Sequence, residues 1–88
     1  MTNNELLKKQ ILYRSSHRGT KEMDLLLSNF VKKHLNTFDD TELNDLNEFL
    51  FIDDETIYNW YFKKIESKKI PSNNISKIFR KFVLNRNI

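Results

Sequence analysis

The chain has 88 residues, which allows one small domain with one modest core, and it contains no cysteine. The missing cysteines exclude a disulfide scaffold, a thiolate metal site and a cysteine nucleophile. No apolar run approaches the roughly 18 residues of a membrane-spanning helix. The N-terminal residues lack the apolar stretch of a secretory signal and the Arg-rich pattern of an organelle import sequence, which predicts a cytoplasmic location.

The net charge of +3 is unevenly distributed along the chain. Residues 1–38 carry a net charge of +4, residues 39–62 carry −8, and residues 63–88 carry +7. The acidic block would repel phosphates, so the pattern argues against a uniformly basic nucleic-acid binder. Two interpretations remain: the segments pair with one another or with a partner of mixed charge, or they form solvated helix faces of both signs.

Apolar residues recur every three or four positions, which is the spacing of helices rather than of strands. One glycine and one proline leave few residues for tight turns, which disfavours a β-barrel. We therefore predict an all-α fold, a compact bundle of about five short helices, as a single domain over residues 1–88 with its core at about 5–86. The predicted helices span about residues 4–15, 20–36, 40–51, 54–66 and 73–86.

Polar residues mark the expected starts of three of these helices. Asp39, followed three residues later by Glu42, predicts a capping box, in which Asp takes the role of Ser or Thr. Asp53 is the expected N-cap of the fourth helix, and Ser72 or Asn73 that of the fifth. Asp39 and Asp53 are therefore assigned structural roles.

The helical spacing also predicts which side chains face the core. In the aromatic run of the fourth helix not every ring can face inward, so we place Trp60 in the core and expect Tyr61 or Tyr58 to face outward as a partner anchor. In the other helices the expected inward-facing residues are Leu6, Leu7, Ile11, Met23, Leu26, Leu27, Phe30, Val31, Leu43, Leu46, Phe49, Leu50, Ile75, Ile78, Phe79, Phe82 and Val83.

The sequence offers little catalytic chemistry. It contains no glycine-rich phosphate loop and no nucleophile elbow, and neither His17 nor His34 has acids at a metal-ligand spacing. The adjacent carboxylates Asp53 and Asp54 fit a helix start better than an acid–base pair. We predict no metal site and a protein that is not an enzyme.

The most distinctive local feature is the run Arg18-Gly19-Thr20-Lys21-Glu22 at the expected junction of the first two helices. A glycine lets another backbone approach closely, and the flanking Arg and Glu offer a fork of donors and an acceptor for a polar contact. The same residues also fit a plain helix junction with a local Arg–Glu pair. The residues expected to contact a partner are Arg18, Gly19, Glu22, Arg14, His17, Asp24 and Tyr61.

This run and a second one resemble the signatures of the succinate dehydrogenase flavinylation factors, also called succinate dehydrogenase assembly factors. The first resemblance is an RGxxE motif followed by Met23-Asp24 and three leucines. The second is an "L…DD…[FY]NW" segment, here Leu50, Asp53-Asp54 and Tyr58-Asn59-Trp60, and the turn Phe38-Asp39-Asp40-x-Glu42 fits as well. The resemblance covers about residues 6–86 and departs at Thr20, where many members carry Met.

The resemblance implies a five-helix assembly factor that is not itself an enzyme. It implies transient binding to the flavoprotein subunit of succinate dehydrogenase, a part of respiratory complex II, and in some bacteria to fumarate reductase. The factor then promotes covalent attachment of FAD to a histidine of that client. FAD is the client's cofactor, and no cofactor is expected to stay bound to this chain. The matching contact residues are Arg18, Gly19 and Glu22.

Two other functions remain open at this point. A small helix-turn-helix or other nucleic-acid binder would use the basic residues Lys8, Lys9, Arg14, Arg18, Lys77, Arg80 and Lys81. An adaptor with an unrelated protein client is the other alternative. On the leading interpretation we expect a monomer that binds no nucleic acid and inserts into no membrane.

Overall fold

The computed structural model describes residues 3–84, and within these residues it contains five helices and no strand. The helices are α1 (Asn3–Ser16), α2 (Lys21–His34), α3 (Asp40–Phe49), α4 (Asp54–Phe62) and α5 (Asn74–Lys81). The predicted all-α fold of about five short helices is confirmed. None of the helices in the described part of the chain is long and apolar enough to cross a membrane.

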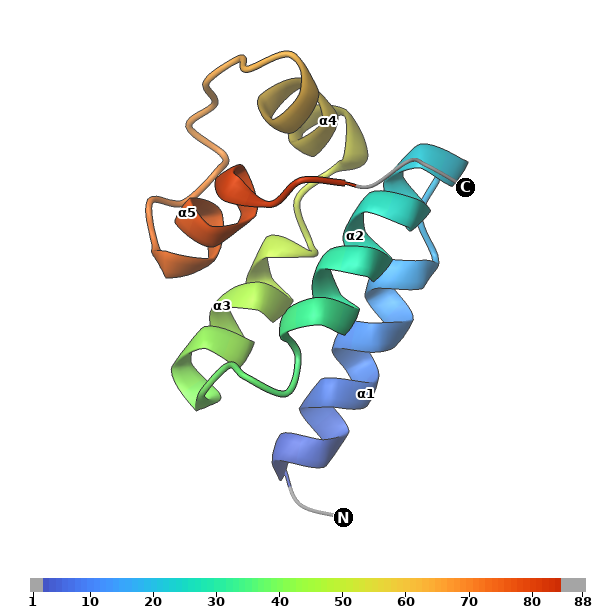
Figure 1. Ribbon diagram of the computed structural model, residues 1–88, viewed down its shortest axis with the longest axis vertical. Helices are drawn as coiled ribbons and strands as arrows, with labels where there is room; N and C mark the ends of the chain where they lie inside the picture. The colour runs from blue at the N-terminus through green and yellow to red at the C-terminus, as the bar shows by residue number, and fades with distance from the viewer. Residues whose placement is uncertain (1–2, 85–88) are drawn as a thin grey trace.

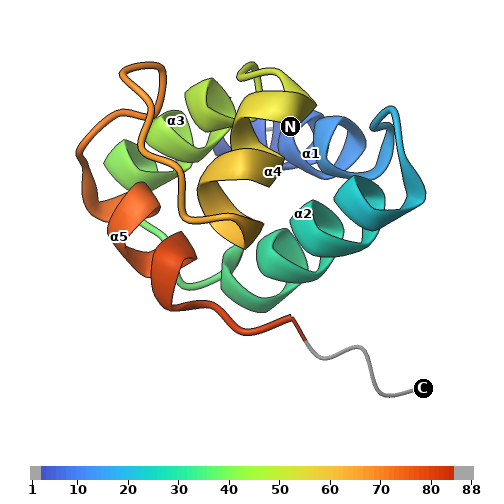
Figure 2. The same ribbon diagram turned by 90° about the horizontal axis from the view of Figure 1, so that it is seen from above.

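The helices surround one apolar core. α1 packs against both α2 and α3, and α3 packs against α5. Figure 1 shows α1 and α2 side by side, with α4 and α5 toward the end away from the N-terminus. Viewed from above, α4 lies over the middle of the arrangement (Figure 2). This placement brings the start of α4 next to the α1–α2 turn.

Aromatic rings fill the centre of the core. The ring of Phe79 lies 4.3 Å from that of Phe30, 5.2 Å from that of Phe49 and 5.3 Å from that of Tyr61, measured between ring centroids. Trp60 lies 6.0 Å from both Phe49 and Phe79 and is only 3% exposed, so its predicted core position is confirmed. These rings join α2, α3, α4 and α5 in one cluster.

The predicted helix caps are present. The Asp39 side chain accepts the N–H of Glu42 at 2.8 Å, and the Glu42 carboxylate accepts the N–H of Asp39 at 3.1 Å, which completes the capping box. Asp53 caps α4. Its carboxylate accepts hydrogen bonds from the side chain and the backbone of Thr56, and these bonds, the side-chain bond most of all, lower the pKa of Asp53. Asn73, one of the two expected candidates, caps α5.

Helix α4 ends at Phe62, four residues before its predicted end. Lys64 has a φ of 59°, in the left-handed region. The N–H groups of Lys63 and Ile65 both donate to the carbonyl of Asn59 at 3.1 Å, and the left-handed Lys64 between them turns the chain out of the helix. No glycine near Lys64 marks this turn in the sequence, so the prediction from apolar spacing alone extended the helix too far.

Helix α5 also ends early, because Phe82 is extended, and the last residues of the predicted helix lie outside the described residues. The Tyr61 hydroxyl donates to the Phe82 carbonyl, and the Phe82 ring lies 5.3 Å from that of Phe30. These contacts hold the chain off a helical path. The predicted core positions of Val83 and Leu6 are wrong. Val83 follows the end of α5 and is 81% exposed, and Leu6 lies on the outer side of α1 and is 50% exposed.

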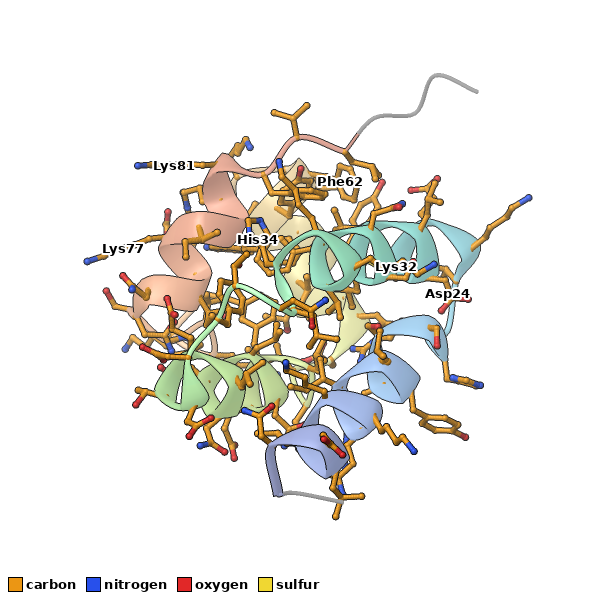
Figure 3. The ribbon with its side chains drawn as sticks, turned by 60° about the horizontal axis from the view of Figure 1, so that its bottom comes forward. Asp24, Lys32, His34, Phe62, Lys77 and Lys81 are labelled. Carbon is orange, nitrogen blue, oxygen red and sulfur yellow. The ribbon has the colours of Figure 1, made fainter. Side chains whose placement is uncertain are left out.

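His34, at the end of α2, lies among aromatic rings. Its ring is stacked on Phe38 at 5.3 Å and lies 4.7 Å from Phe30. Figure 3 shows His34 between α2 and α5, whereas Lys77 and Lys81 project outward from α5. Burial lowers the pKa of the His34 imidazole, and the charge of Lys33 lowers it further. The folded state therefore favours neutral His34.

The lowered pKa of His34 predicts a pH-dependent stability. The unfolded chain binds the imidazole proton more readily, so the stabilising contribution of neutral His34 is complete above the ordinary histidine pKa and is lost as the pH falls from that value through the lowered pKa of the folded state. We expect the midpoint of urea unfolding to fall between about pH 7.5 and pH 5. In His34→Phe this fall of the midpoint with pH should become smaller, whereas in the control His17→Gln it should persist. An unchanged slope in His34→Phe would contradict the assignment.

The buried position of Trp60 predicts a large loss of stability in Trp60→Ala. Removing the ring leaves a cavity between Phe49 and Phe79, and such changes cost about 3–5 kcal/mol. The measurement is urea unfolding followed by circular dichroism. Phe51, which is 62% exposed, provides the control, and Phe51→Ala should cost less than about 1 kcal/mol. Equal losses of stability in the two variants would contradict the core position of Trp60.

Candidate functional site

The candidate site lies where the α1–α2 turn meets the loop between α3 and α4. The turn carries Arg18 and Gly19, and Thr20 caps α2 by accepting the N–H of Met23 at 3.2 Å. Asp54 is the first residue of α4 and reaches the same turn. Residues 36 positions apart in the sequence thus meet directly.

Arg18 points into the protein, and its side chain is only 10% exposed. Its Nε and Nη2 atoms lie 2.8 Å and 2.7 Å from Oδ1 of Asp54. The guanidinium group also donates to the carbonyls of Leu50 at 2.7 Å, Ile52 at 3.0 Å and Arg14 at 3.3 Å. All three nitrogens of the guanidinium are therefore used within the fold. Arg18 holds the α1–α2 turn against the α3–α4 loop.

The other carboxylate oxygen of Asp54 accepts the N–H of Gly19 at 2.8 Å. A Cβ atom on Gly19 would lie 3.3 Å from this oxygen, which is a tight contact with a carboxylate that Arg18 already fixes. Gly19 has no positive φ, so its requirement is close approach rather than backbone conformation. The N–H of Arg18 donates to Asp24 at 2.5 Å, so Asp24 also stabilises the turn.

The alternative of a local Arg18–Glu22 pair is wrong, because Arg18 pairs with Asp54 instead. Glu22 is exposed in the first turn of α2, and within residues 3–84 its carboxylate has no ion pair or side-chain hydrogen bond. The two charged residues of the RGxxE motif therefore differ in their environment. Arg18 is occupied inside the fold, and Glu22 is available at the surface.

Arg14 and His17 lie beside the motif, at the end of α1. The guanidinium of Arg14 donates to Asn47 at 3.2 Å and lies 4.5 Å from the centre of the Phe51 ring. The exposed His17 ring is stacked on Tyr13 at 3.9 Å between centroids. The structure thus brings both predicted residues to the edge of the site.

Tyr61 does not belong to this surface. It is only 9% exposed, and its hydroxyl donates to the Phe82 carbonyl, so the expectation that it faces outward is wrong. α4 turns its Tyr61 side toward the aromatic core around Phe79. The other candidate, Tyr58, is half-buried and lies next to the RGxxE motif.

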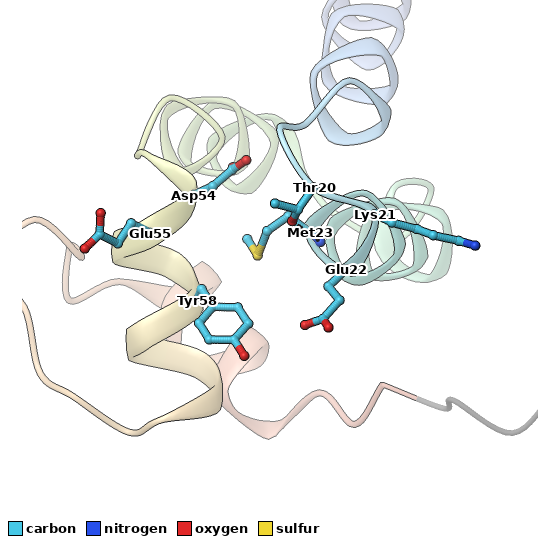
Figure 4. A pocket seen from close by; sticks show the side chains of 7 residues that line it. All are labelled: Thr20, Lys21, Glu22, Met23, Asp54, Glu55 and Tyr58. Carbon is cyan, nitrogen blue, oxygen red and sulfur yellow. Dashed lines mark hydrogen bonds between the residues drawn. The ribbon is translucent and has the colours of Figure 1, made fainter.

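A groove of about 560 Å³ opens between the start of α2 and the start of α4 (Figure 4). It is lined by Thr20, Lys21, Glu22, Met23, Asp54, Glu55 and Tyr58. Sequence reasoning expected only Tyr61 or Tyr58 of α4 to contact a partner and missed Asp54 and Glu55, because these two acids also fit a helix start. The second motif of the family resemblance, which contains Asp53-Asp54 and Tyr58, was the sequence signal that α4 belongs to the site. No cluster of three potential metal ligands occurs among the described residues.

The geometry predicts that Arg18 and Glu22 differ in their effect on stability. Arg18→Ala leaves Oδ1 of Asp54 and three carbonyls without the guanidinium donor. We expect a loss of about 2–4 kcal/mol, below the value for a fully buried pair because Asp54 still contacts water. Asp54→Asn should also destabilise the protein, whereas Glu22→Ala should change the stability by less than about 0.5 kcal/mol. Urea unfolding of the three variants tests this, and equal stabilities would contradict the arrangement.

Comparison with known proteins adds named relatives. The chain is 39% identical over 67 residues to "Succinate dehydrogenase assembly factor 2, mitochondrial" of Meyerozyma guilliermondii, covering 76% of this chain and 50% of that protein. It is 40% identical over 62 residues to the protein of the same name from Dictyostelium discoideum, covering 70% of this chain and 44% of that protein. An "FAD assembly factor" of Acetobacter pasteurianus is 28% identical over 76 residues, covering 86% and 67% of the two chains.

The chain spans about half the length of the eukaryotic relatives that it matches. No solved structure matches it significantly. Residues 9–83 match the sequence profile of the family described as "Flavinator of succinate dehydrogenase", and this region includes the whole RGxxE motif and the whole of α2, α3, α4 and α5. The chain therefore belongs to the flavinator family of succinate dehydrogenase.

Proposed function

We propose that this protein is an assembly factor that binds the flavoprotein subunit of succinate dehydrogenase and promotes the covalent attachment of FAD to it. The observation that carries the proposal is the family match over residues 9–83. Relatives named as assembly factors of succinate dehydrogenase and of FAD support it. The chain acts as a binding partner, and FAD remains the cofactor of the client.

A physical mechanism follows from this role. The flavin and the client's histidine supply the reacting groups, so the factor needs no catalytic residue of its own. It has to bind more tightly to the client conformation in which the two groups are close, and this differential affinity shifts the client toward that state. Holding reacting groups in a near-attack geometry lowers a barrier by several kcal/mol.

The proposed contact surface is the exposed part of the site rather than the whole RGxxE motif. Gly19 and Glu22 are exposed, and Arg14 and His17 lie at the edge of the same surface. Arg18 contributes indirectly, because it fixes the turn on which Gly19 lies. In this arrangement Arg18 and Asp54 are positioning residues.

The comparisons support this function and not nucleic-acid binding. Arg18, one of the residues that the nucleic-acid alternative requires, is bound to Asp54 and is not available to a phosphate. The monomeric state, the cytoplasmic location and a second client such as fumarate reductase stay predictions.

The test is the covalent flavin content of the client. The factor and the client flavoprotein are co-produced, and the acid-stable flavin fluorescence of the client is measured beside the melting temperature of each factor variant. We expect Glu22→Ala and Gly19→Arg to reduce covalent flavin sharply while both variants stay helical. The matched control is Glu48→Ala, an exposed acid on α3, which should behave as wild type.

Three outcomes of this experiment would count against the proposal in different ways. Wild-type factor that leaves the client's covalent flavin unchanged would refute the function itself. Normal flavinylation with Glu22→Ala and Gly19→Arg, alongside an active wild type, would show that the contact surface lies elsewhere. Flavinylation lost with Glu48→Ala as well would show that the effect is not specific to this surface.

A further inference from the structure

The groove between α2 and α4 has an apolar inner end and a polar mouth. Met23 is 1% exposed, and Figure 4 shows its sulfur directed into the space between the two helices. The half-buried Tyr58 ring forms the α4 side, and Glu22 reaches toward it from α2. The groove thus combines an aromatic face, a buried thioether and a carboxylate on opposite sides of one opening.

The charges that line the groove are mostly negative. Glu22, Asp54 and Glu55 contribute carboxylates, and Lys21 is the one cation among the lining residues. Figure 4 shows the Lys21 side chain pointing away from α4 and the Glu55 side chain pointing away from α2, so neither charge lies between the two helices. Asp54 is already paired with Arg18, whereas within residues 3–84 no ion pair reaches Glu22 or Glu55. The ammonium group of Lys63 lies 5.9 Å from the centre of the Tyr58 ring, but Lys63 is not among the lining residues, so the available charge that lines the groove is that of Glu22 and is negative.

The helix starts do not reverse this sign. The N-termini of α2 and α4 favour anions through their free N–H groups and dipoles. Here the side chains of Thr20 and Asp53 already cap them, and acidic residues occupy both first turns. A phosphate that enters the groove, including that of FAD, would meet the Glu22 carboxylate. Charge complementarity thus favours a cationic occupant.

We propose that this groove receives an arginine side chain from the client flavoprotein. The inference rests on the proposed function and adds the chemistry of the partner to it. The guanidinium plane stacks on the Tyr58 ring and donates to the Glu22 carboxylate, while the aliphatic part of the arginine enters the space between α2 and α4. Tyr58 thereby joins the contact surface, although it does not belong to the RGxxE motif.

Arginine fits this groove better than lysine for two reasons. Its planar guanidinium stacks on an aromatic face and at the same time forms two parallel hydrogen bonds to a carboxylate. It is also more weakly hydrated than an ammonium group, so entering a groove with an apolar inner end costs less. A lysine ammonium would find the charge of Glu22 but would not use the flat Tyr58 ring in the same way.

A test without the client uses small probes. The protein labelled with ¹⁵N is titrated with N-acetyl-arginine-N-methylamide, with the lysine analogue, and with the uncharged citrulline analogue. We expect the arginine probe to shift the amide signals of Glu22, Met23 and Tyr58, the lysine probe to bind more weakly, and citrulline to leave the signals in place. Glu22→Gln should abolish the arginine response, and Glu48→Gln should retain it. No response to arginine, or an equal response to citrulline or lysine, would overturn the proposal.

A second test measures the affinity for the client flavoprotein. We expect Glu22→Gln to raise Kd about thirtyfold or more, because a charge-assisted contact in a desolvated interface is lost. Tyr58→Leu should raise Kd about threefold to thirtyfold, and Glu48→Gln should leave it unchanged. Circular dichroism and unfolding curves check that each variant remains folded.

The two tests separate this inference from the proposed function. Wild-type protein that raises the client's covalent flavin, together with Glu22→Gln and Tyr58→Leu variants that bind the client normally, would overturn the groove assignment and leave the function intact. A wild type that does not affect flavinylation would refute the function, and the probe titration would still decide whether the groove binds a guanidinium group.

Discussion

The ion pair between Arg18 and Asp54 is the interaction on which the geometry of the candidate functional site depends. One carboxylate receives the guanidinium group and the N–H of Gly19, and the same guanidinium binds the carbonyls of Leu50 and Ile52. The α1–α2 turn and the α3–α4 loop are thereby fixed against each other. Because α4 begins at Asp54, this contact also places the second wall of the groove. The site is preorganised by bonds that lie beneath its surface.

This arrangement divides the RGxxE motif into two parts with different physical roles. The guanidinium group of Arg18 donates to three backbone carbonyls, so Arg18 holds the backbone in place. Glu22 remains exposed on the first turn of α2 without such partners in the described part of the chain. On the proposed contact surface, a loss of function after a change at Arg18 would report on the shape of the turn, whereas a loss after a change at Glu22 would report on contact with the partner.

The uneven charge of the sequence has a structural counterpart. Asp54, from the acidic block, pairs with Arg18 of the first basic segment at 2.7 Å, and Asp53 lies 3.5 Å from Lys69 of the second. The first pair is largely buried and the second is exposed, so only the first is expected to contribute much to stability. Other acids of the block, such as Glu48 and Glu55, stay on the surface. Both interpretations of the charge pattern therefore hold in part: some segments pair within the fold, and other charges remain solvated.

The sequence by itself determined the elements of the fold. Apolar spacing indicated five helices, Asp39 and Asp53 marked two of their starts, and Trp60 was placed in the core, because these features depend on periodicity and on local hydrogen bonds. Only the tertiary structure decided where α4 and α5 end, since a left-handed Lys64 and the bond from Tyr61 to Phe82 leave no simple sequence signal. The RGxxE motif was visible in the sequence, but the sequence did not show that Arg18 is buried while Glu22 is exposed. Arg18 has its acceptor 36 residues away, and that distance is closed only when α4 packs over the α1–α2 turn.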